Sequence, residues 1–195
     1  AFNGATVDLH TTDGPGKLAV KTMKIGDTQY LNVVDMYFTD VDNGWATLGE
    51  YETDDDGNPI AMKAEGGLLR TTDGGETWSV IFDGLMEYPD RIRMVNDSVG
   101  YLVGATPDNV FLRKTTDGGE NWMDLTIPAI PDRPALQFLD DIEVFDENSV
   151  LILGSATISD EAGFSALLKI ADGETVTVDA DYPLADKDVV MADLA

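Results

Sequence analysis

Residues 70–78 have the sequence Arg-Thr-Thr-Asp-Gly-Gly-Glu-Thr-Trp, and residues 114–122 have the sequence Lys-Thr-Thr-Asp-Gly-Gly-Glu-Asn-Trp. The aspartates of the two copies, Asp73 and Asp117, are 44 residues apart. A segment that returns almost unchanged at an interval of about 40 to 50 residues is typical of a fold built from four-stranded repeats. We therefore predict that the chain consists of repeated β units.

The repeated segment has the residues of a tight turn held by its own side chain. Asp-Gly favours a turn because glycine reaches positive φ without a Cβ clash. The aspartate can accept hydrogen bonds from backbone N–H groups just ahead of it. Trp78 and Trp122 follow; each offers a large apolar face and has an N–H group that needs a partner. Each copy is predicted to be a β-hairpin whose aspartate is structural rather than catalytic.

Two weaker copies flank this pair. Asp13 lies in Thr-Thr-Asp-Gly-Pro-Gly-Lys-Leu, with leucine in the tryptophan position. Asp172 lies in a turn that lacks one glycine and has Val176 in that position. The four turn aspartates are 60, 44 and 55 residues apart, which matches four-stranded blades with insertions.

A second strand–turn–strand pattern precedes three of these turns. Its copies cover residues 35–49, 92–104 and 142–154, and the second strand of each is continuously apolar. Such a strand is expected where both faces of a sheet are covered, as they are for the inner strands of a propeller. We predict an all-β fold: a β-propeller, or an arc of one, made of four-stranded antiparallel blades.

The predicted domain covers residues 1–195. It has an outer half-blade at 1–25, blades at 31–82, 90–127 and 140–178, and the start of a further or shared blade at 187–195. Two arrangements stay open. The two ends of the chain could share one composite blade and close a four-bladed ring, which would hide the edge strands, or the chain could be an arc of a larger propeller.

The charge limits the partners. The chain has 37 Asp and Glu against 12 Lys and Arg, a formal net charge of −25, and no cysteine. This charge repels nucleic acid and anionic membranes, and no stretch of about 20 apolar residues is present to span a bilayer. We expect a protein partner, either a cationic one or a further copy of the chain. The charge is also typical of a solvated acidic surface in a saline or extracellular setting.

Two loops have unusual compositions, one acidic and one rich in proline. Glu52, Asp54 and Asp56 alternate like the start of a calcium loop, but Lys63 stands where such a loop needs a bidentate glutamate. A solvated hairpin tip is the favoured interpretation, with a weak calcium site as the alternative; no other cofactor is expected. The proline-rich loop at 128–134 is predicted to be extended.

The turn segment resembles the Asp-box, or BNR repeat, of sialidases and sortilin-type receptors. That resemblance implies a propeller in which the box joins two outer strands of a blade, away from any active site. A longer pattern resembles the photosystem II stability/assembly factor propellers and their bacterial relatives over about residues 31–178; it consists of Asp35, Phe38, Gly44, Trp45, Ala46, Gly49 and the segment from Thr71 to Trp78.

The second resemblance implies a non-enzymatic binding protein, a scaffold in assembly, located in the lumen, the periplasm or the cell exterior. Its photosynthetic members present a basic patch, whereas this chain is acidic and has five arginines. We therefore carry over the fold and the scaffolding class but not the partner. The alternatives are a fragment of a sialidase-like propeller glycoside hydrolase and an extracellular structural subunit. A sialidase needs three convergent arginines, which the spacing of these five does not favour, and no catalytic residue is predicted.

Overall fold

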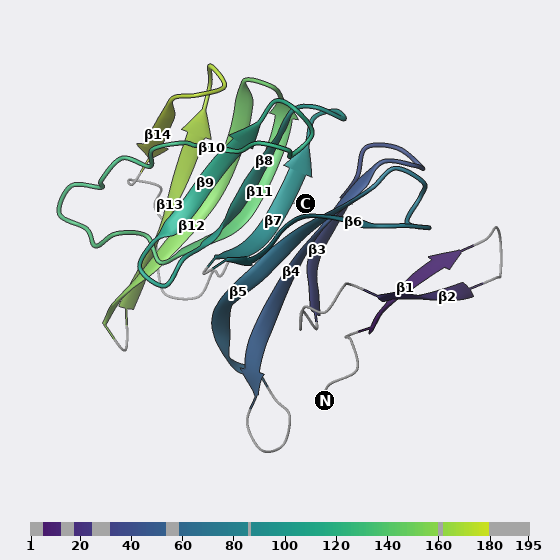
Figure 1. Ribbon diagram of the computed structural model, residues 1–195. Coiled ribbons are helices and arrows are strands. Elements are labelled where there is room, and N and C mark those ends of the chain that lie inside the picture. The colour runs from purple at the N-terminus through teal and green to yellow at the C-terminus, as the bar shows by residue number, and fades with distance from the viewer. Residues whose placement is uncertain are drawn as a thin grey trace. The chain divides into compact units, whose positions relative to one another are not determined.

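The computed structural model describes residues 6–12, 18–24, 32–53, 59–85, 87–159 and 162–179 (Figure 1). These residues form fourteen β-strands and no helix. None of them therefore forms a helix long and apolar enough to cross a membrane. The predicted all-β class is confirmed.

Twelve of the strands form three four-stranded antiparallel sheets, each a meander in chain order, which we call the first, second and third blades. The first blade contains β3 (Asn32–Phe38), β4 (Gly44–Thr53), β5 (Pro59–Thr71) and β6 (Ser79–Leu85). The second contains β7 (Tyr88–Met94), β8 (Gly100–Ala105), β9 (Val110–Thr115) and β10 (Met123–Asp124). The third contains β11 (Phe138–Asp146), β12 (Ser149–Ser159), β13 (Ala162–Ile170) and β14 (Val176–Asp179). A separate hairpin pairs β1 (Thr6–Thr12) with β2 (Leu18–Lys24).

The chain divides into two compact units, residues 1–90 and 91–195. In the first unit, Ala46, Leu48 and Leu69 form a buried cluster against which Trp78 packs. Gly49 of β4 lies under the ring of Tyr88, and a Cβ there would lie 2.2 Å from the ring. Only glycine permits this close approach, which explains why position 49 is a glycine.

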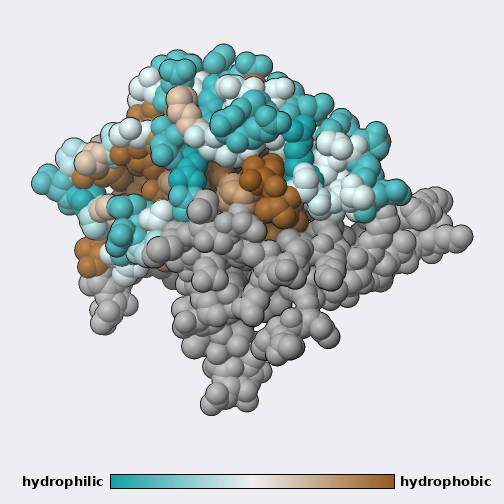
Figure 2. Space-filling model, viewed as in Figure 1, coloured by the Kyte–Doolittle hydropathy of each residue, from teal (hydrophilic) through white to brown (hydrophobic). Residues whose placement is uncertain are grey.

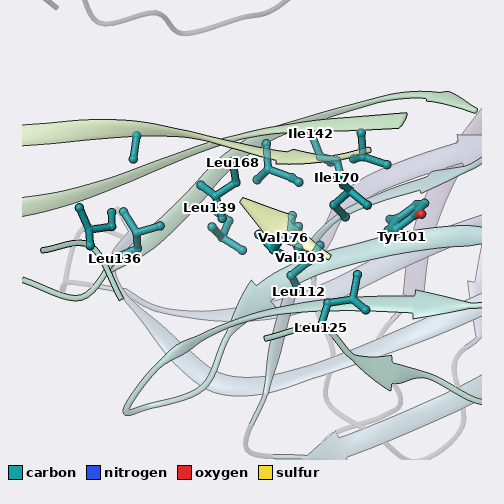
Figure 3. Close-up of a cluster of buried hydrophobic side chains, with 14 residues drawn as sticks. Tyr101, Val103, Leu112, Leu125, Leu136, Leu139, Ile142, Leu168, Ile170 and Val176 are labelled. Atoms are coloured by element: carbon teal, nitrogen blue, oxygen red, sulfur yellow. The ribbon is translucent and has the colours of Figure 1, made fainter. Parts of the chain in front are cut away.

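In the second unit, the second and third blades pack face to face through one hydrophobic core (Figure 3). The second blade contributes Tyr101, Val103 and Leu112, which alternate with residues of the opposite face as β geometry requires. The third blade contributes the larger share, namely Leu139, Ile142, Val150, Ile152, Ala166, Leu168, Ile170 and Val176. This packing of neighbouring sheets is what the continuously apolar β8 and β12 segments predict.

The loop between β10 and β11 is only partly extended. Ile130 and Leu136 insert into the core and anchor the loop. Between them the chain turns at residues 131–133, with Asp132 at a φ of 58°. The amide of Arg133 donates to the carbonyl of Ile130 at 3.2 Å. The prediction of an extended proline-rich segment is therefore wrong in the middle of the loop, because burial of the two apolar anchors bends the chain.

Candidate functional site

The turns that carry the repeated aspartates are held by a fixed set of hydrogen bonds. At Asp117, the hydroxyl of Thr115 donates to Oδ1 at 2.9 Å, and the Asn121 amide donates to the same oxygen at 2.9 Å. The Asn121 side chain donates to Oδ2 at 2.8 Å. The Thr115 hydroxyl also accepts the amide of buried Gly119 at 2.9 Å. One threonine and one aspartate thus order the whole turn.

The Asp73 turn has the same arrangement of hydrogen bonds, with one change of donor. Thr71 donates to Oδ1 at 2.8 Å and accepts the Gly75 amide at 2.9 Å. Thr77 replaces the asparagine, and its amide and hydroxyl donate to Asp73 at 2.8 and 2.6 Å. The glycine pairs of both turns have positive φ, from 68° to 94°, which explains why the sequence has two glycines at this place.

The tryptophans pack but do not hydrogen-bond as the sequence suggests. Trp78 lies over Gly75 and makes an edge-to-face contact with Phe38, with ring centroids 6.1 Å apart. Within the described part of the chain, the buried indole N–H groups of Trp78 and Trp122 have no hydrogen-bond partner. The expectation of such a partner is therefore wrong for both tryptophans.

The turn at Asp172 is one residue shorter and is held by a different set of hydrogen bonds. Ile170 stands in the position of Thr115, so no hydroxyl is available there. Asp172 Oδ1 instead accepts the amides of Glu174 and Thr175 at 3.1 and 2.7 Å. Val176 takes the place of the tryptophan and joins the core of the second unit.

Hydrogen bonds keep the turn carboxylates ionised. The Thr77 hydroxyl, followed by its amide, lowers the pKa of Asp73 to about 2. The Thr175 side chain and amide lower the pKa of Asp172 to about 2. The Asn121 side chain and amide also lower the pKa of Asp117. The turns between the first two strands of the first and third blades behave alike, because Asn43 lowers the pKa of Asp40 and the Asn148 amide lowers that of Asp146.

Two side chains of the second blade join it to the turns of the third. The buried Tyr101 hydroxyl donates to the carbonyl of Glu147 at 2.8 Å. Lys114 Nζ donates to the carbonyls of Glu147 and Gly173 at 3.2 and 3.0 Å. Burial, reinforced by Asp146 and neighbouring carboxylates, raises the pKa of Tyr101 to about 12. The sequence analysis missed both residues; the only signal was the basic residue that precedes both tryptophan-bearing turns.

These contacts bring the turns of the second unit together along one edge. The Gly118 amide also donates to the Ser98 carbonyl at 2.8 Å, which ties the two turns of the second blade together. We call this surface the turn edge; its exposed carboxylates are Asp97, Asp117, Glu120, Asp146, Glu147, Asp172 and Glu174. The turn edge is a negatively charged surface. Figure 2 shows that hydrophilic residues cover much of the described surface in this view.

The other predicted site residues are not brought to this edge by anything the structure describes. Asp13, Asp54 and Asp56 lie outside the described residues, and Glu52 is described only as part of strand β4. The calcium site therefore stays a prediction. Among the described residues, no group of three His, Asp or Glu side chains is placed to hold a metal ion.

Among the described residues, Arg70, Arg113 and Arg133 contact aromatic rings at separate places. The Arg113 guanidinium lies 4.4 Å from the Phe111 ring centroid and pairs with Asp124 at 2.6 Å. The Arg133 guanidinium lies 5.5 Å from the Phe164 ring centroid. In the first unit, the Arg70 guanidinium lies 5.2 Å from the ring centroid of Trp45. These contacts fix each arginine within its own surroundings.

No family model matches this chain, and no curated protein matches it. Among solved structures, the chain is similar to YCF48 bound to D1 peptide, at 22% identity and a TM-score of 0.45, over 75% of this chain and 38% of that one. It is also similar to YCF48 from Cyanidioschyzon merolae, at 19% identity and a TM-score of 0.46, over 75% of this chain and 39% of that one. The chain thus spans less than half the length of either structure.

The lowered pKa of Asp73 predicts a specific acid response. A carboxylate whose folded pKa lies below its unfolded value of 3.8 adds stability above that value, and this stability is lost as the pH falls through the folded pKa of about 2. Asp73→Asn should therefore be less stable than the parent at pH 7 and should lose less stability between pH 4 and pH 2. Urea unfolding midpoints measured from pH 7 to pH 2 check this.

Asp108→Asn is the control for this experiment. Asp108 is exposed, and among the described residues its carboxylate takes no hydrogen bond. Its curve should follow the parent throughout. An Asp73→Asn curve parallel to the parent would show that the turn hydrogen bonds do not depend on the charge.

Proposed function

We propose that this chain is part of a β-propeller scaffold of the Asp-box type that binds another protein and catalyses no reaction. The proposal is supported by the hydrogen bonding and ionisation of the turn carboxylates. Among described carboxyl groups with a clearly shifted pKa, all five shift downward, and hydrogen bonds from their own turns cause each shift. A general acid needs a pKa raised toward neutrality. These acids therefore suit turn formation and fixed negative charge better than proton transfer.

A cationic protein is the partner that this surface favours. The turn edge gathers seven exposed carboxylates on turns held by hydrogen bonds, and the whole chain carries a formal charge of −25. Such a field speeds the approach of basic partners and opposes acidic ones. It also opposes self-association at low salt. An extracytoplasmic location agrees with this composition and is part of the proposal.

The glycosidase alternative has less support. Sialidase chemistry needs several arginines directed at one substrate carboxylate. Here Arg113 is held by Asp124 and Phe111, and Arg133 by Phe164. Both arginines already make contacts within the second unit. Arg113 lies on β9, and Arg133 lies in the loop between β10 and β11.

The test combines a turnover assay with a binding assay. The purified chain is screened against fluorogenic glycosides, where we expect no turnover. Fluorescence anisotropy then measures binding to lysine-rich and glutamate-rich peptides of equal length at low and moderate salt. We expect only the lysine-rich peptide to bind, and salt to weaken it. Turnover of a glycoside, or equal binding of both peptides, would overturn the proposal.

A matched pair of triple variants locates the binding. Glu120→Gln, Glu147→Gln and Glu174→Gln together neutralise part of the turn edge but leave its turn-holding aspartates in place. Asp108→Asn, Asp132→Asn and Asp140→Asn remove the same charge at the opposite ends of the strands. The first variant should weaken binding of the lysine-rich peptide several-fold more than the second.

A further inference from the structure

A basic residue stands three positions before each of the four turn aspartates. These residues are His10, Arg70, Lys114 and Lys169, and each lies on the strand that leads into its turn. Lys114 shows what this position can do, because its Nζ donates to the carbonyls of Glu147 and Gly173 in two turns of the third blade. At Lys114 the basic residue of one blade thus binds the turns of the blade that follows in the chain.

The oxygens around the Lys114 ammonium form a small cradle that a glycine keeps open. A Cβ at Gly173 would lie 2.8 Å from Lys114 Nζ, 2.9 Å from the Glu147 carbonyl oxygen and 2.7 Å from Asn148 Oδ1. Any side chain at position 173 would therefore fill the space that the ammonium uses. We call the two carbonyls, with the side-chain oxygen beside them, the carbonyl cradle of a blade.

The first blade has the same cradle without a basic group in it. A Cβ at Gly74 would lie 2.9 Å from the Val41 carbonyl oxygen and 4.0 Å from Asp42 Oδ1, so Val41 and Asp42 stand where the third blade has Glu147 and Asn148. Among the described residues, no hydrogen bond reaches the carbonyl of Val41 or of Gly74. Val41 is 85% exposed, which leaves this turn accessible.

The charge of the first-blade cradle favours a cation. Carbonyl oxygens only accept hydrogen bonds, and they bind charged donors more strongly than neutral ones. Asp42 replaces the neutral Asn148 and adds a carboxylate beside the two carbonyls. The cradle of the first blade therefore suits a basic side chain at least as well as the cradle that Lys114 fills.

We propose that the carbonyl cradle of the first blade is the docking site of the β1–β2 hairpin, and that His10 donates to the carbonyls of Val41 and Gly74. The structure describes His10 as a residue of β1 that pairs with Val20. The hairpin precedes the first blade in the chain, as the strand of Lys114 precedes the third blade. The competing occupant is a lysine of a partner protein. The chain's own residue has the advantage, because a short tether gives an effective concentration on the order of 1 mM.

A histidine in this position makes the docking sensitive to pH. Imidazolium donates from both ring nitrogens, whereas neutral imidazole donates from one, and the change ordinarily occurs at about pH 6.5. The charged groups of the two first-blade turns are Asp40, Asp42, Asp73 and Glu76. Those of the hairpin strands are Asp8, Lys21 and Lys24. Carboxylates ordinarily titrate at about pH 4 and lysines at about pH 10. Docking should therefore be tighter at pH 5 than at pH 8, through His10.

The test is a series of ¹⁵N–¹H NMR spectra of the intact chain between pH 5 and pH 8. His10 is the only histidine, so its ring signals are identified without ambiguity. The amides of Asp42 and Gly75 share a peptide bond with the two cradle carbonyls, and we expect their signals to move together with those of the His10 ring. The amides of Asn148 and Glu174, beside the cradle that Lys114 fills, should stay in place because lysine keeps its charge in this range.

Two variants of His10 separate docking from a general effect of pH. In His10→Lys, the Asp42 and Gly75 signals should stay at the positions that the parent shows at pH 5. In His10→Gln, they should stay at the parent's pH 8 positions. Lys21→Gln removes a cation from the same hairpin at another position and should titrate as the parent does. Signals of Asp42 and Gly75 that do not move in the parent, or that move equally in His10→Gln, would overturn the proposal.

The lysine-rich peptide tests the competing occupant. Added to the parent at pH 5, it should leave the Asp42 and Gly75 signals in place, while in His10→Gln it should move them. Equal shifts in both proteins would show that the cradle is open to an outside lysine, and would overturn the docking of the hairpin. The proposal does not depend on the proposed function: a peptide that fails to bind the parent counts against the scaffold, while the pH series still decides the role of His10.

Discussion

Replacing Leu168 with alanine is expected to lower the free energy of unfolding by about 3 kcal/mol. Leu168 is fully buried in the core between the second and third blades, and it pairs with Ile152 and Val178 on the flanking strands. One of its methyl carbons lies 3.3 Å from the place where Gly154 would carry a Cβ. Two sheets held by such packing cannot close around the lost side chain, so most of the cavity should remain.

Urea unfolding followed by tryptophan fluorescence and by circular dichroism measures this loss. Leu167→Ala is the control, since Leu167 is the preceding residue on the strand, is half-buried and lies on the opposite side of the sheet. It should cost clearly less than Leu168→Ala. Equal losses for the two variants would mean that the blades do not pack through the face that contains Leu168.

The sequence predicts local features of this fold well, because they arise from neighbouring residues. Asp-Gly-Gly favours a tight turn because glycine reaches positive φ without a clash, and Gly118 and Gly119 both have positive φ. The apolar run at residues 150–154 predicts a strand covered on both sides, and Ile152 and Leu153 lie on opposite faces with 0% and 7% exposure. Both inferences depend only on backbone sterics and on the side-chain alternation of strands.

Features made by residues far apart in the sequence could not be predicted in the same way. Tyr101 donates to the carbonyl of Glu147, 46 residues away, and Lys114 reaches Gly173, 59 residues away. Such bonds depend on how one blade is placed against the next. The turn at Asp132 could not be predicted from the sequence for a similar reason. Burial of Ile130 and Leu136 in the core decides the path of the loop.

The sequence predicts the turn edge only in part. The sequence predicts each aspartate turn separately, and it predicts a large negative charge. It does not show that turns of two blades meet. The bonds from Lys114 and Tyr101 to the third blade establish this meeting. Burial raises the pKa of Tyr101, and the nearby carboxylates of Asp146, Glu147, Asp172 and Glu174 raise it further.

Replacing Thr115 with valine is expected to cost about 2 kcal/mol of unfolding free energy. Valine has nearly the same shape, so no cavity forms and the effect is that of the hydroxyl alone. Thr115 is 1% exposed. Its hydroxyl accepts the amides of Asp117 and Gly119 and donates to Asp117 Oδ1. Without it, the buried Gly119 amide loses its partner in a place that water does not reach. A buried donor left unsatisfied destabilises a protein more than the loss of a solvent-exposed hydrogen bond does.

Thermal and urea unfolding measure the change, and Thr116→Val is the control because Thr116 is the next residue and is exposed. We expect Thr116→Val to stay within about 0.5 kcal/mol of the parent. The third blade supports this assignment, since Ile170 occupies the equivalent position and its turn is one glycine shorter, with Asp172 taking amides two and three residues ahead. The hydroxyl is thus needed only by the two-glycine turn. If Thr115→Val proved as stable as Thr116→Val, the aspartate alone would hold that turn.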